Sequence, residues 1–180
     1  MNTQSFAPIL AALFGELVHG SPDPAARTYV LNRGDMGLLA SLDRISAASA
    51  SIMHAGGASI AAHADHLRYG LSLLNRWANG PPPPWPDMDW TASWKKNVVS
   101  DEQWKALRAE LRREAEAWAN VVRAPRELSE IEAGWMAGSV VHIAYHLGAI
   151  RQIDRAAAGP SAEDEARAEA HLRKPESTSG

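Results

Sequence analysis

The sequence predicts an all-α protein on two observations. Apolar residues recur at three- and four-residue steps along most of the 180-residue chain, whereas alternating β-branched runs are nearly absent. Glycine and proline clusters divide the chain into helical segments separated by short joints and one long connection. We therefore expect a four-helix bundle with an extra N-terminal helix and a long crossover between the second and third bundle helices.

The extra helix is predicted at about residues 5–19, where it ends at Gly20. The run Ser21-Pro22-Asp23-Pro24 then predicts a turn, since proline and Asp favour turn geometry. The first bundle helix is predicted over residues 35–54, because leucine and isoleucine recur on one stripe there. Gly56-Gly57 separates it from the next helix.

The second bundle helix is predicted at about residues 58–79 and ends at Gly80. Residues 81–84 are four consecutive prolines, which lack N–H donors and impose an extended conformation. The connection that starts with them continues to about Ser100. This long segment is the predicted crossover.

The third bundle helix starts with a capping-box pattern, in which Gln103 follows Ser100 by three residues, and it ends near Arg123 before Pro125. The fourth is predicted over residues 130–158 and ends at Gly159-Pro160. Residues 161–180 are predicted to be a charged C-terminal tail.

Loop length predicts the topology of the bundle. A two-glycine joint makes the first two helices antiparallel neighbours, whereas a connection of roughly twenty residues can cross the bundle and leave the second and third helices parallel. The second and fourth helices then lie together. His66 can therefore face His142 and His146.

Composition indicates one domain over residues 1–160, with a core at about 33–158, since 46% of the residues are hydrophobic. Eighteen basic residues oppose 21 acidic ones and are scattered, which argues against a nucleic-acid partner. The apolar run from Phe6 to Phe14 follows no basic residue and is too short to span a bilayer. We therefore expect a cytoplasmic protein without membrane contact.

His142 and His146 are the most informative residues, because a four-residue step places two imidazoles on one face of a helix. Paired histidines also occur as half-buried or surface polar residues. Here they lie in an apolar stretch, where a polar group without a partner costs free energy. His66 on another helix would complete a site of three neutral nitrogens, whose remaining positions stay open to water or substrate.

The histidine motifs resemble those of the DinB-like (YfiT-like) metalloenzyme family, over about residues 33–158. The matching residues on the second and fourth helices are Ser59, Ile60, His66, Leu67, His142, His146, Gly148 and Ile150. The resemblance implies a bundle with a long second connection and a three-histidine site for a divalent metal. Ala149 replaces a glutamine that is frequent in the family, and Gln152 is a possible substitute one turn on.

His63 lies three residues before His66, and the sequence leaves open whether it is a ligand, a hydrogen-bonding partner of a ligand, or neither. We expect it to line the cavity or to hydrogen-bond at its rim. Asp65 and Tyr69 flank His66, so either can orient an imidazole or donate to substrate. Three tryptophans either anchor the long connection or also form a wall of the metal cavity: Trp85, Trp90 and Trp94.

A metal-dependent enzyme is the first functional hypothesis. The expected ion is zinc or nickel, with manganese or iron as alternatives, because imidazole is a borderline ligand and the chain has no cysteine. The resemblance implies a thiol-dependent S-transferase or a hydrolase that acts on a small molecule, with a low-molecular-weight thiol as one candidate. Catalytic residues are not identifiable from the sequence. If imidazoles with ordinary pKa values hold the ion, binding falls below about pH 6.

Two other hypotheses are a metal-binding or stress-related interaction protein without turnover, and a haem protein with His66 and one histidine of the pair as axial ligands. The haem hypothesis ranks last, because two histidines one turn apart suit a compact ion.

We also expect a homodimer, since family members often pair and the N-terminal helix has an apolar stripe. That stripe contains Phe6, Ile9, Leu10, Leu13 and Phe14. Alternatively, this helix folds onto its own bundle.

Overall fold

The computed structural model describes residues 6–21, 23, 25–81, 84–124 and 128–172, and this part contains helices and no strands. The all-α prediction is confirmed. No helix of the described part is long and apolar enough to cross a membrane. Several prolines on which the predicted turn, crossover and end of the third bundle helix depend lie outside the described residues: Pro22, Pro24, Pro82, Pro83 and Pro125.

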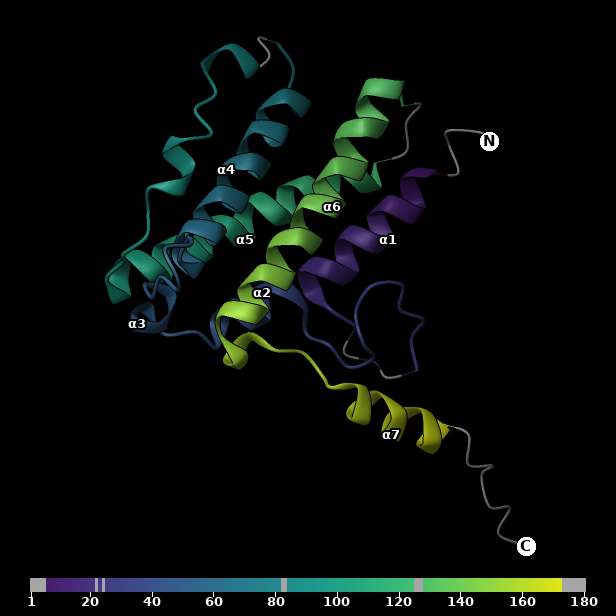
Figure 1. The fold of residues 1–180 in the computed structure, drawn as a ribbon. Coiled ribbons are helices and arrows are strands. Elements are labelled where there is room, and N and C mark those ends of the chain that lie inside the picture. The colour runs from purple at the N-terminus through teal and green to yellow at the C-terminus, as the bar shows by residue number, and fades with distance from the viewer. Residues whose placement is uncertain (1–5, 22, 24, 82–83, 125–127, 173–180) are drawn as a thin grey trace, which may run out of the picture.

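Four long helices pack against one another (Figure 1). They are α1 (Phe6–His19), α4 (Ile60–Ala78), α5 (Asp101–Arg123) and α6 (Glu130–Ile153). Helix α4 contacts both α5 and α6, and α1 contacts both α5 and α6 from the other side. The shorter elements are α2 (Gly37–Asp43), α3 (Ala47–Ala50), α7 (Ala162–Leu172) and the 3-10 helices η2 (Trp85–Asp87), η3 (Ala92–Trp94) and η4 (Arg155–Ala157).

The long connection returns the chain to the end of the molecule where α4 began (Figure 1). Two hydrogen bonds show how close the starts of α4 and α5 are. The N–H of Ser59 donates to Asn97 Oδ1 at 3.0 Å, and the N–H of Val99 donates to Ser51 Oγ at 3.1 Å. Helices α4 and α5 therefore begin at the same end, as the crossover predicts, whereas α6 runs against α4.

Helix α1 is an integral part of this packing rather than an appendage. Leu10, Phe14 and Leu17 are buried against the neighbouring helices of the same chain, while Phe6 and Ile9 stay 40% and 51% exposed. The alternative in which this helix folds onto its own bundle is therefore the observed one. Leu10 and Phe14 of the predicted stripe are thus covered within the chain, whereas Phe6 and Ile9 stay exposed, and the homodimer stays a prediction.

The helix predicted over residues 35–54 is wrong in its middle, where the chain breaks into α2 and α3. In a continuous helix, the N–H of Ser49 would donate to the carbonyl of Ile45. Instead this N–H donates to the side chain of Ser46, which caps α3. The Ile45 carbonyl accepts a 2.7 Å hydrogen bond from Trp104 Nε1 on α5. A tertiary contact thus replaces a helical one.

The fourth bundle helix also ends earlier than predicted, at Ile153 rather than near residue 158. Asp154 leaves the helical region with φ −133° and its side chain caps η4. The predicted tail contains α7, which starts with a reciprocal cap. Asp164 accepts from the N–H of Ser161, and Ser161 Oγ accepts from the N–H of Asp164. Residues 173–180 of the tail lie outside the described part.

A buried ion pair fixes the end of α6 to the loop that precedes α2. Arg151 donates to both carboxylate oxygens of Asp35, at 2.7 and 2.8 Å, and the Asp35 side chain is only 2% exposed. The same carboxylate accepts from the N–H of Gly37 at 2.8 Å. This clamp holds one end of the helix that carries two of the site histidines.

Candidate metal centre

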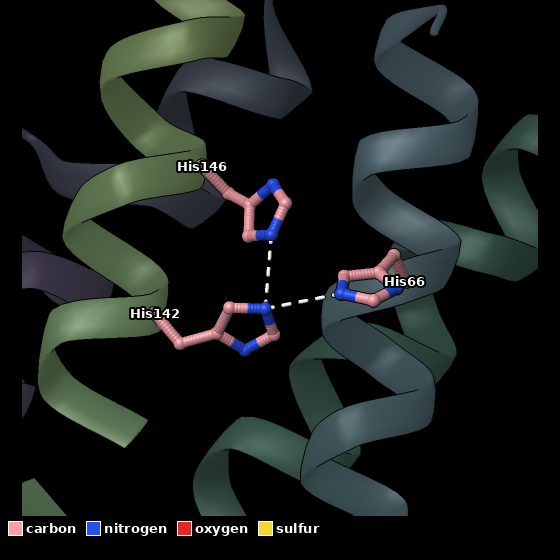
Figure 2. Close-up of side chains that lie close together, drawn as sticks. All are labelled: His66, His142 and His146. Carbon is pink, nitrogen blue, oxygen red and sulfur yellow. Dashed lines mark hydrogen bonds between the residues drawn. The ribbon is translucent and has the colours of Figure 1, made fainter. Parts of the chain in front are cut away.

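The structure brings His66, His142 and His146 together between α4 and α6 (Figure 2). His142 Nε2 lies 3.1 Å from His66 Nε2 and 2.9 Å from His146 Nε2. His66 and His146 are buried, at 7% and 1% exposure, and His142 is half-buried. The three predicted ligands therefore point their nitrogens at one another across the interface of the two helices.

Hydrogen bonding alone cannot satisfy this arrangement. A neutral imidazole nitrogen has either one hydrogen or one lone pair, so His142 Nε2 can form an ordinary hydrogen bond with only one of its two neighbours. A cation between the three nitrogens satisfies all of them. Three imidazole nitrogens around a tetrahedral zinc ion lie about 3.3 Å apart, given bonds of about 2.0–2.1 Å, and the separations of 3.1 and 2.9 Å at His142 are close to this value.

Ser93 determines which nitrogen of His66 is available. The Ser93 hydroxyl lies 2.6 Å from the carbonyl of Trp90 and must use its only hydrogen there. It can therefore only accept from His66 Nδ1, which lies 2.8 Å away. His66 then has its hydrogen on Nδ1 and its free lone pair on Nε2. That is the atom that faces His142.

His63 contacts the outer nitrogen of His146, as Ser93 contacts the outer nitrogen of His66. The Nδ1 atoms of the two residues lie 2.8 Å apart, so one donates and the other accepts. If the lone pair of His146 Nε2 faces the centre of the site, His146 Nδ1 is the donor and His63 the acceptor. His63 is buried and is not one of the three residues whose nitrogens converge. It thus orients an imidazole, as expected of a hydrogen-bonding partner.

Burial keeps the imidazoles neutral. It lowers the pKa of His66 to about 4 and that of His146 to about 3, with further lowering from neighbouring histidines. Burial also lowers the pKa values of His63 and His142. At neutral pH all four rings are therefore uncharged, which is the protonation state that metal coordination requires of imidazole.

The tryptophans of the long connection both anchor it and form a wall of the site. The Trp94 ring stacks on His66 with centroids 4.1 Å apart, and Trp90 lies against the same imidazole at 5.3 Å. Trp85 stacks on Trp135 of α6 at 4.7 Å. A cavity of about 500 Å³ lies between Trp85, Trp90 and Trp135 and the helices α4 and α6, with His66 and His142 at one end.

The hydrogen bonds of Asp65 and Tyr69, which flank His66, go to residues other than the site histidines. Asp65 accepts from Arg68 at 2.8 Å and from Lys96 at 3.3 Å. The hydroxyl of Tyr69 accepts from the N–H of Asp89 in the long connection at 2.7 Å. Both residues therefore link α4 to the long connection and, among the described residues, form no hydrogen bond with an imidazole.

Sequence reasoning missed Ser93, because nothing in the run between two tryptophans indicates that a serine meets a histidine 27 residues away. Gln152 is exposed and does not replace the glutamine that the family pattern leads one to expect. Ser93 and His63 instead provide the hydrogen bonds to the outer nitrogens of the imidazoles. Only His63 had a sequence signal, its three-residue distance from His66.

Comparisons of the chain with protein-family models, with curated proteins and with solved structures find no match. Membership of the DinB-like family therefore stays a prediction that depends on the quoted motif residues. The case for a metal site stands separately, on the convergence of the three imidazole nitrogens.

Proposed function

We propose that this protein binds one divalent metal ion per chain through the Nε2 atoms of His66, His142 and His146. One observation carries the proposal: His142 Nε2 lies within hydrogen-bond distance of two other imidazole nitrogens and can bond to only one of them. Haem ligation fits this arrangement poorly, because axial imidazoles lie on opposite faces of a flat macrocycle, whereas these three rings converge on one point.

Zinc or nickel is the proposed ion, with manganese or iron as alternatives. Neutral imidazole suits zinc, nickel and iron, whereas manganese prefers oxygen ligands and is the weakest of the four candidates; the chain has no cysteine to favour a softer ion. The hydrogen bonds from Nδ1 of His66 and His146 are the outer contacts that metal-binding imidazoles usually make. The donor set and its surroundings therefore fit the ion.

We further propose that the protein is a metal-dependent enzyme of the DinB-like type, either a thiol-dependent S-transferase or a hydrolase. Three protein ligands are typical of catalytic sites, which keep a position for substrate or water, whereas structural sites have four. The cavity beside His66 and His142 gives a small molecule access to that position. A bound divalent ion supplies Lewis acidity, which lowers the pKa of a thiol or of water.

The side chains that line the cavity, all of them described, include no Asp, Glu, Lys or Arg. The lining therefore offers no carboxylate or amine as nucleophile, and without cysteine the chain offers no thiol. The one hydroxyl of the lining, that of Ser139, already donates to the carbonyl of Met136. We therefore propose that the nucleophile arrives as a bound molecule. A low-molecular-weight thiol or water meets this requirement, which is why these two reaction classes are proposed together.

Metal analysis of histidine variants tests the site. Wild-type protein, His142→Ala and His54→Ala are loaded with zinc, freed of excess by gel filtration and measured by plasma emission spectrometry. His54 is exposed, so its variant controls for the loss of a histidine outside the site. We expect one ion per chain in the wild type and in His54→Ala, and none in His142→Ala. A fully loaded His142→Ala would overturn the proposal.

Turnover assays test the catalytic part. The metal-loaded protein is incubated with electrophilic and ester substrates, with and without low-molecular-weight thiols. Metal-dependent product that requires the thiol supports the transferase, and product without thiol supports the hydrolase. Stoichiometric metal without turnover of either substrate class would instead favour the non-catalytic metal-binding protein.

A further inference from the structure

The cavity beside the histidines has the dimensions of a small-molecule site. Its volume of about 500 Å³ lies within the usual range for ligand pockets, roughly 300–1,000 Å³. One end contains the imidazoles of His66 and His142. Toward the other end lie Trp85 and Trp135, the latter 40% exposed. A ligand can therefore reach from solvent to the imidazoles along one continuous space.

The walls of this cavity are mostly apolar, and the polar groups of Ser139 and Trp90 are already engaged. Ser139 accepts a 2.8 Å hydrogen bond from Trp118 Nε1 and donates at 2.7 Å to the carbonyl of Met136. Trp90 Nε1 donates to Met88 Sδ. The only ionisable side chains in the lining are the two histidines. A carboxylate or other anion bound along these walls would lose its hydration without gaining a partner, which is costly.

Two helical glycines keep the space open. A Cβ atom at Gly70 would lie 3.5 Å from His142 Cε1 and 3.6 Å from the Trp90 ring. A Cβ atom at Gly138 would meet no described atom of another residue within 4 Å, apart from its own helix turn. Glycine inside a helix costs about 1 kcal/mol relative to alanine. Both glycines thus leave room that a side chain would fill.

We infer that this cavity binds the uncharged, apolar part of a small-molecule substrate, of the size of a benzyl or naphthyl group. The donor atom of that substrate lies at the end formed by His66 and His142. This inference rests on the proposed metal site and adds the class of substrate to it. The tryptophan rings and leucine side chains contact the apolar group, and the charge or polarity of the ligand is confined to the imidazole end.

The apolar part is tested first without metal, so that the outcome does not depend on the ion. Binding of 4-fluorotoluene to the metal-free protein is followed by ¹⁹F NMR. Gly138→Leu places a side chain in the cavity and narrows it, and Gly138→Met is a second variant in case the first folds poorly by circular dichroism. Gly148→Leu is the matched control, since Gly148 is also an exposed α6 glycine with free space at its Cβ but does not line the cavity.

We expect 4-fluorotoluene to bind the wild type and Gly148→Leu, and to bind the Gly138 variants at least tenfold more weakly. No binding to the wild type, or equal binding by all variants, would overturn the inference.

The link to the metal is tested with cobalt-loaded protein and two thiols, benzyl mercaptan and mercaptoacetate, through the sulfur-to-cobalt absorption band. We expect benzyl mercaptan to bind at least tenfold more tightly, with the preference lost in Gly138→Leu and retained in Gly148→Leu. Normal cobalt loading without this preference would overturn the inference and leave the metal site intact. Absent cobalt loading together with normal 4-fluorotoluene binding would overturn the proposed function and leave the apolar cavity.

Discussion

Replacing Ser93 with alanine tests how the site orients its ligands. The Ser93 hydroxyl accepts from His66 Nδ1 at 2.8 Å, which fixes the lone pair of His66 on Nε2. In Ser93→Ala, a metal-bound His66 keeps a hydrogen on Nδ1 without a partner in buried surroundings. An unsatisfied buried donor costs about 1–3 kcal/mol. Since the metal-free imidazole can shift its hydrogen or turn, most of this cost opposes metal binding.

The expected loss of zinc affinity is therefore about 10- to 100-fold, the range usual for outer hydrogen-bonding partners of metal ligands. Competition with a chromophoric chelator at constant pH measures it. Ser139→Ala is the matched control. Ser139 is equally buried, also accepts from an aromatic N–H and also donates to the carbonyl three residues earlier, but its partner is Trp118.

Ser139→Ala should lose stability with unchanged zinc affinity. Wild-type affinity in Ser93→Ala, or an equal loss in both variants, would refute the orientation argument.

Three further predictions concern pH, stability and assembly. Because burial lowers the pKa of His66 to about 4 and of His146 to about 3, below the value of 6.5 expected in the unfolded chain, the unfolded chain takes up protons first as the pH falls. Urea unfolding of the metal-free protein should therefore show full stability above about pH 6.5 and a progressive loss toward pH 4, and constant stability over this range would contradict the assigned burial. Zinc should also stay bound below about pH 6, the limit expected for imidazoles with ordinary pKa values. Asp35→Ala should destabilise the fold by about 3–5 kcal/mol in urea unfolding, because it leaves the Arg151 charge buried without its partner. The control Asp43→Ala should cost at most about 1 kcal/mol, because the Asp43 carboxylate is 47% exposed. Removing α1 should unfold the chain, as seen by circular dichroism, rather than convert a dimer into a folded monomer, and light scattering of the full-length protein tests the homodimer separately.

The sequence predicts best the helices whose ends depend on local chemistry. Ser59, Ser100 and Ser129 each cap a helix through their own side chain, so α4, α5 and α6 start within two residues of the predicted positions. The break between α2 and α3 depends on Trp104, which lies far along the chain and takes the Ile45 carbonyl. Periodicity within one segment has no information on such a partner.

The same distinction holds for the site. His142 and His146 share a helix face by spacing alone, and loop length was enough to place His66 opposite them. Ser93 contributes only because the long connection folds back along α4, so that η3 packs against that helix. The path of a connection depends on many weak contacts of its tryptophans, and these are not readable as a sequence motif.

Electrostatics joins the proposed metal site to the proposed substrate class. Three neutral imidazoles leave the full charge of a divalent ion, and the lining of the cavity has no carboxylate to reduce it. Asp65, next to His66 in sequence, is already paired with Arg68 and Lys96. In apolar surroundings an uncompensated charge is costly, so the site favours an incoming donor atom that is itself negative. A thiolate attached to an apolar group meets both requirements. Its negative sulfur offsets the charge of the ion at the imidazole end, and its apolar group needs no polar partner along the cavity walls.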